Sequence, residues 1–451
     1  MSTAPAFFRL PEELLTMIVD IVVDSVERPA ITPISGDRFS VLQALRETHP
    51  RFAYLKSALR RLFQTVCLPT DPVGIERLEK TTLDRFAPFV QQILFRPPSY
   101  GVEVTYDRFR GELLRQHDKS SGDERCTSCG AYGTMEDTTN DDKVAAAYEY
   151  YCEQREQEKQ VMASGRAESV LLSVIDRLPD ARHFVLAAWN RGRWLKRSAT
   201  HRLIMQHCAE RMDDALMGDE LLQFTTKLIR GANMRLKSYT IGCYTTGRRS
   251  ETLLEEWQSI DLSEMEGLFY YGRVFDDHTH PRDRQLQTDR IGQFYACVAS
   301  QASASLRCLV LRGPLSCRWA PPSNRCPKLE YLKLEDMDLS EGFDAWLKTC
   351  TGPNRFHMAS MTGVQMSTFC VLRKMQPMRI EMDQVYGTPS RKWTLDFHTG
   401  EESNYVHSPE HDSEYWLHAP DALHAFLRGA AASPGLLKMC NEEDFVMPDD
   451  G

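Results

Sequence analysis

A six-residue pattern recurs in the second half of this 451-residue chain and constrains its fold more than any other feature. Leucines fill the first, fourth and sixth positions of segments 306–311 and 329–334, which begin 23 residues apart. Weaker copies with other apolar residues begin at Pro353 and Met375, 24 and 22 residues further on. Apolar residues at alternating positions favour a β-strand, and a constant period of this length is typical of structural repeats that stack on one another.

The same pattern predicts which side chains stack, because side chains alternate between the two faces along a strand. We expect the fourth positions to form one buried row of Leu309, Leu332, Phe356 and Met378. The residues that follow them are expected to face outward; these are Val310, Lys333, His357 and Arg379. We therefore take Lys333, His357 and Arg379 as candidate contacts for a protein target.

The pattern resembles the strand signature of leucine-rich repeats, and the resemblance implies a solenoid of alternating parallel strands and helices. Looser matches begin at Val90, Ala181, Leu236 and Met265, but any three apolar residues qualify, so the series from 306 to 380 carries the assignment. Helices are predicted over 71–86, 168–178 and 219–229, each ahead of a loosely matched strand. Pro314 and Met337 stand where many such repeats carry an asparagine, so we expect an irregular, curved stack.

The first 63 residues show a helical pattern instead. Leu10 and Pro11 precede two glutamates, as at a helix start, where proline fits the first turn and carboxylates favour the positive end of the helix dipole. The apolar residues from Leu14 to Val26 then cover an arc of roughly 240°, more than twice the stripe of an ordinary surface helix. Two more short helices are predicted over 41–47 and 50–62. The excess apolar surface must be buried against a partner, because so small a module has little core of its own.

The segments LPEELLTMIVDIV and FSVLQALRETHPRFAYLKSALRRLF resemble the F-box, which attaches substrate receptors to SCF-type ubiquitin ligases. The resemblance implies that these helices bind a Skp-type adaptor, which links to a cullin and RING scaffold. The linker over 27–37 is longer than is usual in the family. By position, the adaptor contacts would be Leu10, Pro11, Leu14, Leu15, Ile18, Leu42, Leu45 and Phe52. The alternative is a helical cap on the domain that follows.

Together the two patterns predict an α/β chain, with an N-terminal three-helix F-box-like module followed by an irregular leucine-rich-repeat-like strand-helix solenoid. The module spans 1–68, a first strand-helix unit 69–117, and the main repeat body 143–400. Residues 118–142 are rich in Ser, Gly, Thr and Asp and are expected to be a disordered loop. Residues 401–451 are expected to form an irregular tail with one short helix over 421–428.

Composition narrows the class of partner and the compartment. The net charge is −9 and no strongly basic block is present, which argues against nucleic acid or an anionic membrane as the main partner. No uncharged stretch approaches the length that crosses a bilayer. The thirteen cysteines are odd in number and scattered, as expected for free thiols in a reducing compartment, so we expect the cytoplasm or nucleus.

Motifs that would support catalysis or metal binding are weak. Cys126 and Cys129 form one Cys-x-x-Cys pair, whereas a structural zinc site needs two further ligands. His278 and His280 share the spacing found in some metal hydrolases, but further ligands at suitable positions are not evident. We therefore predict no metal, no cofactor and no enzymatic activity, with a metal-dependent hydrolase centred on these histidines as a distant alternative.

A cluster of aromatic and cationic residues follows the loosely matched strand at 181–186. It consists of Trp189, Arg191, Arg193 and Trp194. Tryptophan and arginine are over-represented in binding hot spots, so these residues are candidate target contacts; the alternative is a tryptophan pair packed into the stack. The sequence thus predicts a substrate receptor of an SCF-type ubiquitin ligase that binds an unknown protein target through its repeat body. The alternative is a non-enzymatic interaction scaffold without the ligase link.

Overall fold

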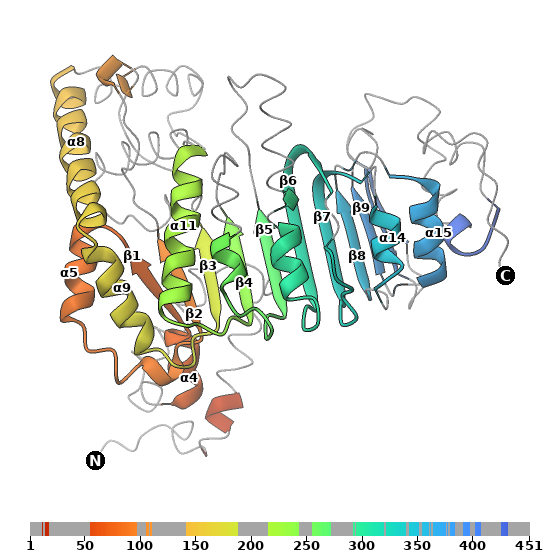
Figure 1. The fold of residues 1–451 in the computed structure, drawn as a ribbon, viewed down its shortest axis with the longest axis horizontal. Helices are drawn as coiled ribbons and strands as arrows, with labels where there is room; N and C mark the ends of the chain where they lie inside the picture. Colours follow the sequence, from red (N-terminus) through yellow and green to blue (C-terminus); the bar gives the residue numbers. More distant parts are fainter. Residues whose placement is uncertain are drawn as a thin grey trace, which may run out of the picture.

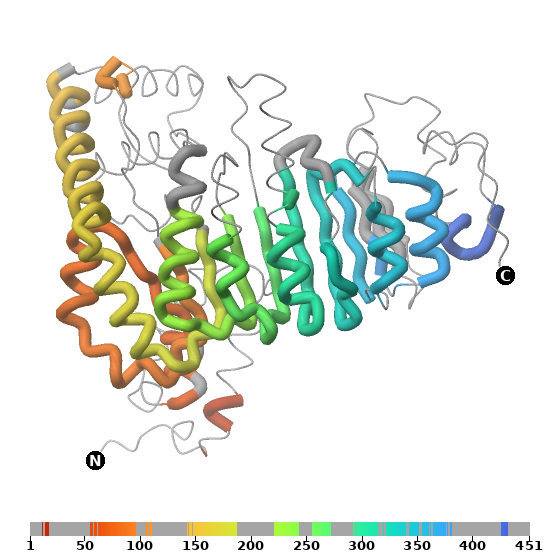
Figure 2. Tube along the Cα trace, in the orientation of Figure 1, coloured from red at the N-terminus to blue at the C-terminus, as the bar shows by residue number. Residues whose placement is uncertain are grey.

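One sheet runs through the molecule, with its strands side by side in the order in which they occur along the chain (Figure 1). The computed structural model describes residues 11, 14–17, 55–96, 105–107, 109–110, 141–187, 215–242, 255–271, 292–293, 295–319, 322–339, 342–350, 354–359, 361, 364–375, 377, 379–383, 391–396, 402–406 and 425–431. Within these residues the sheet has 11 strands. The colours in Figure 2 follow the same order along the sheet, so neighbouring strands are also neighbours in sequence.

The strands from β1 to β9 pair in parallel, and the last two strands add an antiparallel edge. Their bounds are β1 (Thr65–Pro69), β2 (Gln92–Arg96), β3 (His183–Ala187), β4 (Ser238–Gly242), β5 (Gly267–Tyr271), β6 (Cys308–Arg318), β7 (Tyr331–Asp338), β8 (Arg355–Ala359), β9 (Arg379–Asp383), β10 (Arg391–Asp396) and β11 (Glu402–Val406). Parallel neighbours require a crossover between consecutive strands, as in a strand-helix solenoid.

Helices in these crossovers lie along one face of the sheet (Figure 1). They are α5 (Pro72–Lys80), η2 (Ala87–Phe89), α8 (Asp141–Ala163), α9 (Arg166–Asp176), α11 (Ala215–Gly231), α14 (Phe343–Leu347) and α15 (Met366–Met375), with further helical segments at 255–258 and 295–301. One more helix, α4 (Lys56–Phe63), precedes β1. The predicted helices over 168–178 and 219–229 are confirmed as α9 and α11. α8 continues beyond the ends of the strands at one end of the sheet (Figure 1).

The predicted helix over 71–86 is shorter in the structure. α5 begins as expected, because Asp71 Oδ1 accepts a hydrogen bond from the Gly74 N–H at 2.9 Å and Pro72 fits the first turn. It ends at Lys80, since Thr81 adopts an extended backbone and its N–H bonds back to the Leu78 carbonyl. The chain then makes the short helix η2 before β2.

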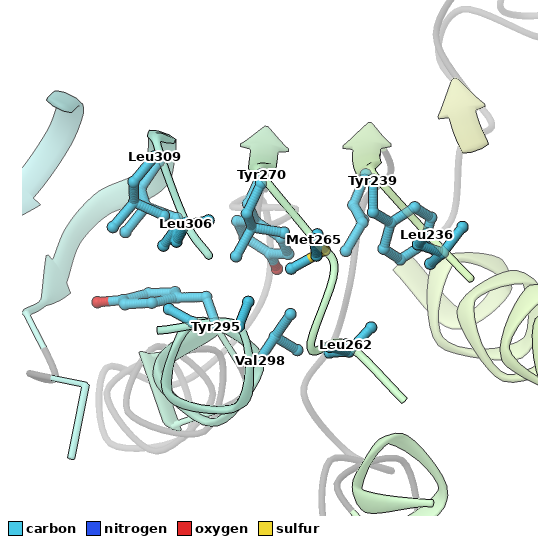
Figure 3. Close-up of a cluster of buried hydrophobic side chains, with 14 of the residues drawn as sticks. Leu236, Tyr239, Leu262, Met265, Tyr270, Tyr295, Val298, Leu306 and Leu309 are labelled. Carbon is cyan, nitrogen blue, oxygen red and sulfur yellow. The ribbon is translucent and has the colours of Figure 1, made fainter. Parts of the chain in front are cut away.

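The core lies between the sheet and these helices. Side chains on this face of the sheet contribute to it, and one row of them runs from strand to strand as register partners. This row is Val66, Ile93, Phe184, Tyr239, Leu268, Leu309, Leu332, Phe356 and Ile380. Figure 3 shows Tyr270 and Leu309 pointing from their strands toward the 295–301 helix, which contributes Tyr295 and Val298. Tyr239 instead stacks on Trp257, with ring centroids 5.0 Å apart. Burying each row against helices and against neighbouring strands is what stabilises a repeat stack.

The predicted row of Leu309, Leu332 and Phe356 is confirmed, because these residues are register partners and are at most 1% exposed. The fourth member was wrong: Ile380, not Met378, pairs with Phe356. Side chains repeat every two residues along a strand, so a shift of two residues keeps the same face buried and the sequence pattern fits both choices.

The loosely matched segments at 90–95, 181–186, 236–241 and 265–270 are strands too, in the same register as the leucine repeats. Their first positions are all buried. An unpredicted copy, Phe63-x-x-Val66-x-Leu68, leads into β1, so the boundary predicted after residue 68 falls inside this strand. The weak matches were therefore informative because their apolar positions share one face.

The tail over 401–451 was predicted to be irregular apart from one helix, but it contains β11, which pairs with β10 as an antiparallel edge of the sheet. This strand forms because it pairs with a neighbouring strand, and the local sequence does not encode that pairing. The helix predicted over 421–428 is described over 425–427, where Phe426 and Leu427 join the core. The first two helices predicted for residues 1–54 lie outside the described residues apart from Pro11 and the turn 14–17. The third, predicted over 50–62, is described in part as α4, which spans Lys56–Phe63.

Candidate functional site

The face of the sheet opposite the helices, here called the second face, carries a charged network over β6 and β7. Arg312 lies opposite Glu335 in the register, and Lys333 lies two residues before Glu335 on the same face. Lys333 Nζ is 2.7 Å from Glu335 Oε1, and Arg312 Nε donates to Asp336 Oδ2 at 2.9 Å. Arg312 Nε also lies 3.9 Å from Glu335 Oε2. Two cations and two carboxylates thus form one continuous network.

A backbone irregularity positions Asp336. Its φ of 58° lies in the left-handed region that residues with a Cβ rarely adopt, and the pairing of β6 with β7 shifts between Arg312 and Cys317. Such a bulge allows two consecutive side chains, Glu335 and Asp336, to reach the same arginine. The carboxylate side chains are 18% and 17% exposed, so they need paired cations, and the network holds Arg312 and Lys333 in place.

Two ionisable side chains beside the network stay neutral near pH 7. Tyr271 is the register partner of Arg312 on β5, and burial, reinforced by the charge of Glu335, raises the pKa of its hydroxyl to about 12. Burial also raises the pKa of the Cys308 thiol to about 12. Neither group supplies an anionic nucleophile at neutral pH, so this part of the second face is suited to recognition through charge and hydrogen bonds.

The structure aligns three of the four residues that were predicted to form an outward-facing row. Val310, Lys333 and His357 are register partners on the second face, but Val310 is only 1% exposed there. Arg379 was expected to continue this row and does not. It pairs with Arg355, two residues nearer the start of the strand than His357, and both arginines are exposed. The reason is the same shift of two residues that replaced Met378 by Ile380 in the core row.

A second charged feature, which sequence analysis missed, lies where the strands begin. Lys237 and Glu266 are 3.6 Å apart, and Arg307 Nη2 is 2.6 Å from Glu330 Oε1. Each of these four residues directly follows the first apolar residue of its repeat, and the charge at this position alternates between positive and negative from one repeat to the next. This alternation was the sequence signal that could have predicted the ion pairs. The last pair also lines a polar hollow of about 470 Å³ together with Ser305, Lys328 and Asn354. Exposed pairs of this kind contribute little to stability.

The N-terminal turn presents apolar side chains outward. Leu14 is 40% exposed and Met17 is 51% exposed, whereas Leu15 between them is fully buried. Of the predicted adaptor contacts, Pro11 and Leu14 are therefore on the surface, and Leu15 packs inside the chain. Met17 was not predicted as a contact, although it follows Leu14 by three residues and so shares its helix face. Leu10, Ile18, Leu42, Leu45 and Phe52 lie outside the described residues.

No family model, curated protein or solved structure matches this chain. The residues Trp189, Arg191, Arg193, Trp194, Cys126, Cys129, His278 and His280 all lie outside the part that the structure describes. Within that part, no group of three or more His, Cys, Asp or Glu side chains is placed to hold a metal ion. No helix there is long and apolar enough to cross a membrane. A functional proposal therefore rests on the N-terminal turn and the second face.

Proposed function

We propose that this protein is a substrate receptor of an SCF-type ubiquitin ligase. Its N-terminal helical segment would bind a Skp-type adaptor, which links to a cullin and RING scaffold, and the second face would bind a protein target. The receptor performs no chemistry. It raises the effective concentration of target lysines near the ubiquitin-conjugating enzyme, as expected when two binding events are linked in one chain.

The exposed turn at residues 14–17 carries this proposal. Among the described residues, the exposed large hydrophobic side chains are Leu14, Met17 and Val73, so two of the three lie on one helical turn. Leu15 anchors that turn by burial, and its backbone N–H donates to the Pro11 carbonyl at 3.2 Å. An anchored turn with an exposed apolar pair matches what the resemblance to the F-box implies, namely an apolar contact with an adaptor.

The second face supports the other half of the proposal. The network fixes Lys333 and Arg312 in one arrangement before any partner arrives, which lowers the entropy lost on binding. Arg355 and Arg379 extend the charged surface toward the start of the strands. Lys333 and His357 are neighbours in the register and would contact the target together.

The test is capture of a Skp-type adaptor by the full-length protein. A double variant, Leu14→Lys with Met17→Lys, should lower the affinity for immobilised adaptor at least 100-fold, because each change buries an unpaired charge in the contact. Val73→Lys is the matched control. This residue is equally exposed but lies on α5, away from the N-terminal turn (Figure 1), and the variant should bind as the unmodified protein does.

Both variants should melt within a few degrees of the unmodified protein, since surface substitutions rarely change stability by more than about 0.5 kcal/mol. Failure of the unmodified full-length chain to retain adaptor at micromolar concentration would exclude the ligase role. A target-binding scaffold without the ligase link would then be the remaining function of the second face.

A further inference from the structure

Two cysteines occupy the same place in consecutive repeats. Cys326 lies three residues before Leu329, and Cys350 lies three residues before Pro353, which begins the next repeat. Each cysteine is also five residues before the first residue of its strand, and those first residues, Tyr331 and Arg355, are register partners on β7 and β8. The thiols are buried, at 0% and 6% exposure, and form no disulfide.

The two cysteines are in contact. The backbone N–H of Cys326 donates a hydrogen bond to Cys350 Sγ, which places that sulfur against the backbone of Cys326. The Cys350 thiol in turn donates to the Trp346 carbonyl at 3.8 Å. Neighbouring parallel strands are about 4.8 Å apart, a spacing that lies within the range of about 4.4–6.8 Å between Cα atoms that a disulfide needs.

We propose that Cys326 and Cys350 are a redox-sensitive pair that forms a disulfide between the repeats of β7 and β8. The oxidant would be a small disulfide such as oxidised glutathione. One cysteine thiolate attacks a glutathione sulfur, which forms a mixed disulfide and releases one glutathione thiolate. The second cysteine thiolate then attacks the protein sulfur of that mixed disulfide and releases the second glutathione. Two thiols lose two protons and two electrons, and one glutathione disulfide is reduced to two thiols.

Burial makes this reaction slow and conditional. It raises the pKa of Cys326 to about 12 and that of Cys350 to about 11, so little thiolate is present at neutral pH while the pair stays buried. Exchange therefore requires opening of the segment 342–350, in which α14 is a helix of five residues. The link would then fix the spacing of the two strands that carry Lys333 and His357. This inference is independent of the proposed ligase role.

Peptide mapping of the full-length protein tests the proposal without any substitution. The protein is incubated with oxidised or reduced glutathione for several hours, alkylated, digested and analysed by mass spectrometry without reduction. We expect a cross-linked peptide pair containing Cys326 and Cys350 in the oxidised sample, and its loss after dithiothreitol. The melting temperature should rise by a few degrees on oxidation, because the link restricts the unfolded chain.

Matched variants identify the source of that shift. Cys326→Ala should abolish both the cross-linked peptide and the rise in melting temperature. Cys370→Ala, which changes another buried cysteine on α15, should leave both in place. The proposal is overturned if Cys326 and Cys350 carry only separate glutathione adducts, pair with other cysteines, or are alkylated by reagent added in denaturant after oxidation.

Discussion

At the scale of single residues, the two faces of β7 separate stability from recognition. Leu332 points into the core between the sheet and the helices, and its exposure is 0%. Lys333, the next residue, points to the second face and pairs with Glu335. The alternation of side chains along a strand assigns neighbouring residues to opposite tasks. The sequence was sufficient to predict this division, because Lys333 stands between Leu332 and Leu334.

Substitutions at these two positions should therefore differ sharply. Leu332→Ala should lower the free energy of unfolding by about 2–5 kcal/mol, since it leaves a cavity in a packed row. Lys333→Ala should lower it by less, on the order of 1 kcal/mol, because it opens no cavity in the core and Arg312 remains 3.9 Å from the Glu335 carboxylate. Urea unfolding measures both values. Equal losses for the two variants would contradict the assignment of the faces.

At the scale of elements, the end of the stack is closed by a contact that only the folded chain reveals. Arg373 on α15 donates from Nη1 to the Ala430 carbonyl at 3.1 Å and from Nη2 to the Gly429 carbonyl at 2.9 Å. Its guanidinium carbon lies 5.1 Å from the centroid of the Phe426 ring. Gly429 has a φ of 111°, which a residue with a Cβ would not adopt without strain. The segment 425–431 is thus held against the last repeat.

Arg373→Ala should release this segment. We expect a loss of about 1 kcal/mol in stability and faster hydrogen exchange at the amides of Gly429 and Ala430, which bond back to the carbonyls of Phe426 and Ala425. Arg373→Lys should have nearly the same stability and hydrogen exchange as Arg373→Ala, because a lysine cannot donate to two carbonyls from one planar group. Lys348→Ala, at an exposed position after α14, is the control and should leave exchange at these amides unchanged.

At the scale of the whole molecule, each repeat of the stack is stabilised by the repeats on either side of it. Each strand from β2 to β8 is paired on both sides with the adjacent repeats, so stability is spread along the sheet and insertions between repeats are tolerated. The prediction of a loop over 118–142 was wrong for its last two residues, because α8 begins at Asp141.

Deletion of residues 118–139 should leave the fold intact. The segment is polar and rich in Ser, Gly, Thr and Asp, so it has little apolar area to bury. We expect a melting temperature within a few degrees of the full-length value, and limited proteolysis of the intact chain should cut this segment first. A larger drop would show that Cys126 and Cys129 contribute to the structure.

The sequence by itself determined the approximate places of the strands β2 to β9 and which of their faces is apolar, because apolar alternation and the repeat period are local properties. Even the weak copies upstream of residue 306 obeyed this rule. Tertiary structure decided the rest. The shift from Met378 to Ile380, the left-handed backbone at Asp336 that joins it to Arg312, and the contact between Cys326 and Cys350 all depend on how adjacent repeats align. Alignment between repeats is set by packing over distances that no single segment encodes.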